Sequence, residues 1–155
     1  MKISKSSHHK KIAGDFGEYL VLYWLSKYGF ECVHVDYTGI DIIAKNPHSK
    51  ELMGISVKSR TRIEGTESSS LSIRNTHFEK VKKACETFNC VPYFAFIIDG
   101  KDKIYCYVVS MEHLRKSYRS GKRVFSWKMG TAYLSRYAQD SEIMRVEFDY
   151  KTINW

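Results

Sequence analysis

The stretch from Gly39 to Arg60 constrains the fold of this chain more strongly than any other. Two segments rich in β-branched residues flank a short polar loop, which predicts two buried strands joined as a hairpin. Each segment carries one charged residue among apolar neighbours, Asp41 in the first and Lys58 in the second. Burying a charge costs free energy unless it is paired or binds a metal ion. The two charged residues therefore mark a candidate site.

Side-chain alternation predicts how these charges lie relative to each other. Successive side chains of a strand point to opposite faces, so Ile40 and Ile42 are expected on one face and Asp41 on the other. Lys58 is expected on the same face as Ser56. If the strands pair, Asp41 and Lys58 meet on one side of a small sheet. A structural ion pair would explain both charges without any reaction.

The remaining periodicity predicts an α/β fold, in which a mixed β-sheet is flanked by helices. The predicted helices cover residues 15–28, 76–88 and 110–118, and the predicted strands cover residues 30–35, 39–44, 54–60, 71–73, 93–98, 104–109, 123–127 and 143–148. The length of 155 residues suits a single domain. Within it we expect a mobile basic arm over residues 1–11, a core over 12–110 and a C-terminal extension over 111–155.

The charge balance favours an anionic partner. Lys and Arg number 25 against 17 Asp and Glu, which gives a formal charge of +8. Such a surface favours polyanions, and nucleic acid is the usual one, although solubility also explains a charge of this size. In the extension, Tyr133, Arg136 and Tyr137 mix aromatic and basic groups. They are interpreted either as a stacking surface for single-stranded nucleic acid or as core aromatics beside solvated charges.

The cysteines and the hydropathy exclude other classes of protein. The chain has 4 cysteines, at positions 32, 85, 90 and 106, and none forms a Cys-x-x-Cys pair. A zinc ribbon is therefore not expected, and free thiols in a reducing cytoplasm are the simplest interpretation. No apolar run approaches the roughly 18 residues that a membrane span requires, so we expect a cytoplasmic protein without a membrane partner.

A carboxylate at the start of the first predicted helix has two interpretations. Glu18 precedes Leu22 and Leu25 on one helix face, which is expected to pack against the sheet. This placement would bring the carboxylate toward the predicted strands. Alternatively, Asp15 and Glu18 form a capping box, in which Glu18 bonds back to the amide of the first residue.

Three segments together resemble the PD-(D/E)xK nuclease superfamily, and within it the branch of archaeal Holliday-junction resolvases and restriction-endonuclease-like proteins. They are Gly14-Asp15-Phe16-Gly17-Glu18, Gly39-Ile40-Asp41 and Ile55-Ser56-Val57-Lys58-Ser59-Arg60. The resemblance covers roughly residues 10–110 and makes residues 12–110 a nuclease-like core. It implies a restriction-endonuclease-like mixed sheet with helices on both faces.

The resemblance also implies a site for phosphodiester hydrolysis. The implied catalytic residues are Asp41, Lys58, Glu18 and Ser56, and the implied metal ligands are Glu18, Asp41 and the carbonyl of Val57. The implied ion is Mg²⁺, for which Mn²⁺ can substitute. Ser56 departs from the family pattern, which has Glu, Asp or Gln there, because a hydroxyl brings no negative charge. Asp36, Glu64 and Glu67 are candidates to supply the missing carboxylate.

The implied substrate is nucleic acid, with DNA favoured over RNA. The residues expected to grip phosphates are Arg60, Ser59, Lys10 and Lys11. A homodimer is a further expectation. Two alternatives to a metal-dependent endonuclease stay open at this point: a catalytically degraded module that binds nucleic acid, and a protein-interaction subunit.

Overall fold

The computed structural model describes residues 4–118 and 121–154. Its helices are α1 (His9–Lys27), α2 (Asn75–Phe88), α3 (Met111–Ser117) and α4 (Thr131–Gln139). Its strands are β1 (Glu31–Tyr37), β2 (Ile40–Lys45), β3 (Leu52–Thr61), β4 (Leu71–Arg74), β5 (Val91–Asp99), β6 (Lys103–Ser110), β7 (Val124–Trp127) and β8 (Met144–Asp149). None of the helices in the described part of the chain is long and apolar enough to cross a membrane.

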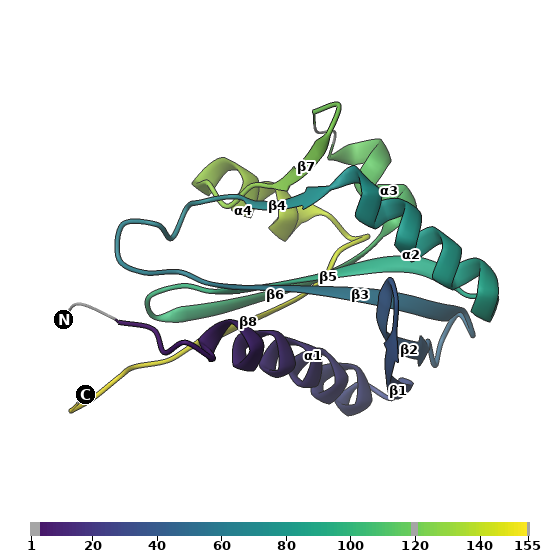
Figure 1. The fold of residues 1–155 in the computed structure, drawn as a ribbon, viewed down its shortest axis with the longest axis horizontal. Coiled ribbons are helices and arrows are strands. Elements are labelled where there is room, and N and C mark those ends of the chain that lie inside the picture. The colour runs from purple at the N-terminus through teal and green to yellow at the C-terminus, as the bar shows by residue number, and fades with distance from the viewer. Residues whose placement is uncertain (1–3, 119–120, 155) are drawn as a thin grey trace.

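The strands form one large mixed sheet and one small sheet. The large sheet has the order β1-β2-β3-β5-β6-β8, in which β3 and β5 are parallel and the other neighbours are antiparallel. β4 and β7 pair separately as a two-stranded sheet. Figure 1 shows α1 along one face of the large sheet, with the other helices and the small sheet on the opposite face. The predicted mixed sheet with helices on both faces is confirmed.

Each face of the large sheet has its own apolar core. The cluster against α1 contains Val21, Leu25, Ile42, Ala44, Met53, Ile55, Val57, Ala95, Ile97, Cys106 and Val108. The cluster on the opposite face includes Ile40, Phe78, Val81, Cys85, Phe94, Phe96, Tyr107, Trp127 and Tyr137. Full burial stabilises each large side chain by roughly 1.5–3 kcal/mol, so the two layers together hold the sheet in place.

The first helix begins earlier than predicted, so Asp15 and Glu18 lie too far from its N-terminus to form a capping box. It starts at His9, so Lys10 and Lys11 lie in regular helix rather than in a mobile arm. Residues 1–3 of that predicted arm lie outside the described residues. Asp15 and Glu18 therefore lie inside the helix, where Asp15 pairs with Lys11 one turn earlier. Glu18 is thus available for a role other than capping.

The backbone of β2 turns at Asp41. Ile40 packs in the cluster under α2, whereas Ile42 packs in the cluster against α1. The prediction that these two side chains share a face is therefore wrong. The pairing of β1 with β2 is irregular between His34 and Tyr37, directly beside this point. Asp41 therefore lies where the regular pairing between β1 and β2 is interrupted.

The C-terminal third is part of the same fold rather than an appendage to it. β8 extends the large sheet by pairing with β6. Trp127 and Tyr137 are almost fully buried and stack with ring centroids 4.0 Å apart and an interplanar angle of 11°. Arg136 lies over the ring of Tyr118 and donates to the Ser117 carbonyl. These contacts favour the interpretation of Tyr137 as a core aromatic, not as a stacking surface for bases.

Candidate metal and nucleic-acid site

Asp41 makes the contact that organises the candidate site. Its Oδ2 accepts a hydrogen bond from the backbone amide of Val57, with an N–O distance of 2.6 Å. The regular pairing of β2 with β3 ends where Ile42 lies opposite Ile55, so Asp41 is the first residue of β2 beyond it. The carboxylate therefore replaces a backbone partner at the point where the two strands separate. This geometry fixes Asp41 beside the segment that carries Ser56 and Lys58.

Lys58 is a partly buried cation that turns back along its own strand. Its Nζ donates to the Ser56 hydroxyl at 2.8 Å and to the Val57 carbonyl at 3.3 Å. Ser56 is 2% exposed. The predicted proximity of Ser56 and Lys58 on β3 is observed as a direct hydrogen bond.

The electrostatics connect Lys58 to both carboxylates. Burial lowers the pKa of Lys58, and the neighbouring charge of Arg60 lowers it further. The charges of Asp41 and Glu18 oppose this shift because they favour the ammonium form. Both carboxylates therefore act on the same cation, although they come from different elements. A buried lysine with a shifted pKa is typical of functional sites.

Glu18 reaches the site region from α1 with a partner that the sequence did not indicate. Its Oε2 accepts a hydrogen bond from His34 Nε2 on β1, at 2.5 Å. The side chain of Glu18 is 23% exposed and that of His34 is 35% exposed. Tyr19, the next residue on α1, stacks on the His34 ring at 5.6 Å. No sequence pattern pairs a helical residue with a strand residue that lies 16 positions later.

α1 approaches β3 closely beside Glu18. A Cβ added to Gly17 would lie 1.8 Å from the hydroxyl of Ser59 and 3.3 Å from Ile97. The Ser59 hydroxyl is buried there and has no hydrogen-bond partner among the described residues. Ser59 therefore does not present its side chain to a phosphate, in contrast to the sequence-based expectation. Its position instead explains the glycine that precedes Glu18.

The other residues expected to grip phosphates lie at the surface. Arg60 is exposed and donates to the Ser59 carbonyl at 2.8 Å. Lys10 is exposed on α1, and Lys11 is exposed but paired with Asp15 at 2.8 Å. Arg60 lies two residues from Lys58 on β3, so it is the best placed of the three for a substrate next to the site.

Two of the three proposed substitutes for a carboxylate at position 56, Glu64 and Glu67, lie in the loop after β3. Glu64 pairs with Lys101 at 3.1 Å in the loop after β3, and Glu67 also acts on Lys101. Asp36 is exposed on β1 and acts on Lys11. Among the described residues, none of these three carboxylates forms a hydrogen bond with Ser56 or Lys58.

Within residues 4–118 and 121–154, three potential metal ligands come within 4.8 Å of one another at a different place. They are His113, Asp140 and Glu142. The two imidazole nitrogens contact different carboxylates, Nε2 with Asp140 at 2.7 Å and Nδ1 with Glu142 at 3.0 Å. A single ion cannot bind both sides of one ring. Burial alone would raise the pKa of Asp140, but hydrogen bonds from Tyr118 and His113 lower it overall. This cluster is therefore a hydrogen-bonded ion network that ties α3 to the segment after α4.

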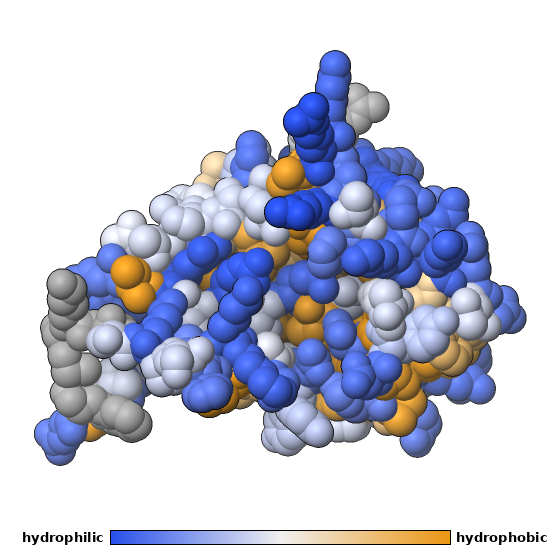
Figure 2. Space-filling view, in the orientation of Figure 1, coloured by the Kyte–Doolittle hydropathy of each residue, from blue (hydrophilic) through white to orange (hydrophobic). Residues whose placement is uncertain are grey.

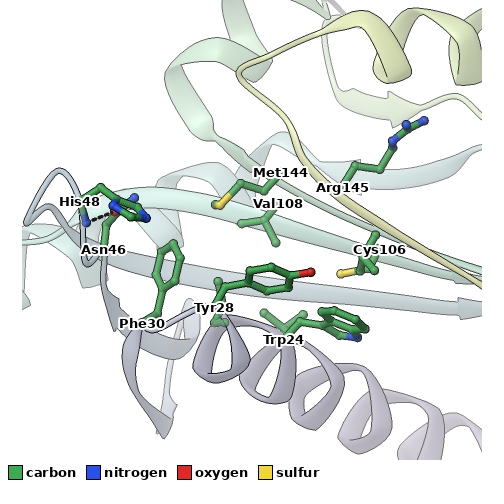
Figure 3. Close-up of a pocket in the computed structure, with 12 residues that line it drawn as sticks. Trp24, Tyr28, Phe30, Asn46, His48, Cys106, Val108, Met144 and Arg145 are labelled. Carbon is green, nitrogen blue, oxygen red and sulfur yellow. Dashed lines mark hydrogen bonds between the residues drawn. The ribbon is translucent and has the colours of Figure 1, made fainter.

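A pocket of about 430 Å³ lies away from the candidate site. Figure 3 shows Trp24, Tyr28 and Phe30 along its α1 side, with Cys106, Val108 and Met144 from the sheet opposite them. None of the predicted catalytic residues lines it. The pocket is thus a gap between α1 and the β6–β8 end of the sheet, separate from Asp41 and Lys58.

The donor set at Glu18 and Asp41 fits a hard divalent cation. Carboxylate, carbonyl and hydroxyl oxygens are the ligands that Mg²⁺ and Mn²⁺ prefer. Mg²⁺ commonly binds through one or two protein carboxylates, keeps several waters and takes further oxygens from substrate phosphates. Two carboxylates therefore suffice for such an ion. The ammonium of Lys58 occupies the Ser56 hydroxyl and the Val57 carbonyl, so these two oxygens are shared with a protein cation.

Comparison with known proteins supports the fold. Neither the protein-family models nor the curated protein sequences match this chain. Among solved structures, 15 chains match. One is Hjc, a Holliday junction resolvase from the archaeal hyperthermophile Archaeoglobus fulgidus, with a TM-score of 0.57, 18% sequence identity, and coverage of 79% of this chain and 88% of that chain. This chain has the Hjc fold. The restriction-endonuclease-like architecture expected from the sequence is thereby confirmed, and the reaction must be argued from the site.

Proposed function

We propose that this protein is a metal-dependent nuclease that hydrolyses phosphodiester bonds of nucleic acid, with DNA favoured over RNA. The observation that carries the proposal is the hydrogen bond from the Val57 amide of β3 to Asp41 of β2, beside Ser56 and Lys58, on a fold shared with a Holliday junction resolvase. The charge of Glu18, from α1, acts on the same lysine. Lysine and arginine outnumber acidic residues by 25 to 17, which favours a polyanionic substrate. The face seen in Figure 2 is largely hydrophilic, with apolar residues in smaller patches.

Each side chain has a defined task in this proposal. Glu18 and Asp41 would hold Mg²⁺ or Mn²⁺ together with the Val57 carbonyl. When bound, such an ion acts as a Lewis acid and lowers the pKa of a coordinated water. The bond from the Val57 amide keeps Asp41 Oδ2 in place, so the carboxylate needs no rearrangement. Lys58 offsets the negative charge that builds up on the phosphate oxygens, and Ser56 fixes the position of its ammonium.

The direct test is metal-dependent cleavage of a panel of branched, duplex and single-stranded DNA and RNA. We expect cutting with Mg²⁺ or Mn²⁺, none with a chelator, and a loss of at least about 100-fold in Asp41→Asn, since this change removes a charge that holds the ion. Circular dichroism would check that the variant is folded. If the native protein and Asp41→Asn show the same trace activity, the activity belongs to a contaminant and the proposal is wrong.

A nucleic-acid-binding module without catalysis is the second candidate function. It is favoured by one observation: position 56 carries a neutral hydroxyl, which Lys58 already uses as its partner. A module of this kind would bind DNA or RNA in a salt-sensitive way that is indifferent to metal. Calorimetry with Mn²⁺ in the absence of nucleic acid separates the candidates, because only the nuclease is expected to give heat of metal binding.

The neutral residue at position 56 leads to a gain-of-function prediction. In Ser56→Asp a third carboxylate joins the site next to Lys58, so Mg²⁺ affinity is expected to rise about tenfold, because the charge of the ligand set tunes affinity for hard cations. Ser56→Asn is the matched control of nearly the same volume without the charge. Calorimetric dissociation constants would measure the effect. Equal affinities of the two variants for Mg²⁺ would show that position 56 does not face the ion.

A further inference from the structure

We propose that His34 is a positioning residue that orients Glu18 for the divalent cation. The inference rests on the proposed function and adds a residue from β1 to a site otherwise built from α1, β2 and β3. It starts from the 2.5 Å hydrogen bond between His34 Nε2 and Glu18 Oε2. Among the described residues, Glu18 forms no other side-chain hydrogen bond with the protein. The imidazole therefore controls where the carboxylate points.

The local structure holds His34 in this position from both sides. On β1, His34 pairs with Ile42 of β2, the residue that follows Asp41. The register between β1 and β2 shifts immediately after His34, which ends the regular ladder beside the candidate site. On α1, the ring of Tyr19 lies nearly parallel to the imidazole, at 5.6 Å and an angle of 12°. The strand pairing fixes the backbone of His34, and the Tyr19 ring restricts rotation of its imidazole.

The bond leaves one carboxylate oxygen for an ion. His34 bonds Oε2, so among the described residues Oε1 has no side-chain hydrogen bond and can be offered to a cation shared with Asp41. Carboxylates that bind metals are themselves hydrogen-bonded, and such supporting residues typically contribute 10- to 100-fold to metal affinity. An ion pair near the surface, in contrast, contributes little to folding stability. A role in orientation therefore predicts a large effect on metal binding and a small effect on stability.

The test compares Mn²⁺ binding to the native protein, His34→Ala and His34→Gln by calorimetry, with Mn²⁺ electron paramagnetic resonance as a second readout. His34→Ala is expected to weaken Mn²⁺ binding about 10- to 100-fold. His34→Gln keeps an N–H donor and is expected to recover most of the affinity. His48→Ala is the control, because it removes an imidazole from the exposed turn between β2 and β3. Thermal unfolding would check that all variants are folded.

The possible outcomes separate this inference from the proposed function. If His34→Ala binds Mn²⁺ as tightly as the native protein while Glu18→Gln does not, the role of His34 is wrong and the metal site stands. If His34→Gln is as weak as His34→Ala and the native spectrum shows a bound nitrogen, His34 is a ligand and positioning is wrong. If the native protein binds no Mn²⁺, the proposed function and this inference both fail.

Discussion

Lys58→Met is expected to lower metal-dependent cleavage by about 10²–10³-fold, because it removes the preorganised cation beside the scissile phosphate. The same change is not expected to lower stability. Burial dominates the lowered pKa of Lys58, so the fold carries a free-energy cost for the charged form despite Asp41 and Glu18. Met keeps the length of the side chain and removes that cost. Cleavage rates and thermal unfolding of the same preparation measure both effects.

The pH dependence of this comparison has a defined sign. Since the pKa of Lys58 is lowered in the folded state, its cost to stability is fully present below that lowered pKa. The cost disappears as the pH rises toward the ordinary value of 10.5, where the unfolded chain also loses the proton. Any stability advantage of Lys58→Met should therefore shrink in alkaline solution. Lys45→Met is the control, because Lys45 is an exposed cation of β2. A Lys58→Met protein that cleaves at the native rate would contradict the assigned role.

Gly39→Ala is expected to destabilise the protein by roughly 2–5 kcal/mol and to weaken cleavage with it. Gly39 has a φ of +108°, and an added Cβ would lie 2.4 Å from the backbone carbonyl oxygen of Lys80 in α2. Both the conformation and the overlap with a helix backbone oppose any side chain. Because Gly39 lies two residues before Asp41, relief of the overlap would move the carboxylate away from Val57. Urea unfolding and cleavage rates would measure the two effects.

Gly65→Ala is the matched control for this prediction. Gly65 also has a positive φ, +84°, but no atom of the described part of the chain lies within 4 Å of the Cβ that alanine would add. It should therefore show only the conformational cost of about 1–2 kcal/mol. If the two variants lose the same stability, overlap with α2 does not explain why position 39 is a glycine.

The sequence predicted the central elements well because their signals are local. The hairpin of β2 and β3, the apolar strand β5 and the cap of α3 follow from composition, and the Ser110 hydroxyl indeed accepts a bond from the His113 amide at 3.1 Å. The start of α1 was not predictable in this way, because His8 at its N-cap makes no side-chain capping bond. α4 was missed for a similar reason, since it follows Gly130 and also has no side-chain cap.

The candidate site likewise contains some residues whose contacts follow from local sequence patterns and others whose contacts do not. The hydrogen bond between Ser56 and Lys58 follows from the alternation along β3. The bond from the Val57 amide to Asp41 does not, because it forms where β2 departs from its predicted alternation. The burial of Ser59 against Gly17 depends on how α1 crosses β3, which no local pattern encodes. The partnership of His34 with Glu18 depends on the same tertiary packing. Local sequence patterns therefore do not predict roles that arise from contacts between distant elements.

The central claim is that one divalent cation binds between α1 and the β2–β3 pair. Crystals soaked in Mn²⁺ and measured at a wavelength where manganese scatters anomalously test it most directly. We expect one strong anomalous peak within bonding distance of the carboxylates of Glu18 and Asp41, and its loss in Asp41→Asn. A peak at His113, Asp140 and Glu142 instead, or no peak near Asp41 at saturating Mn²⁺, would contradict the account.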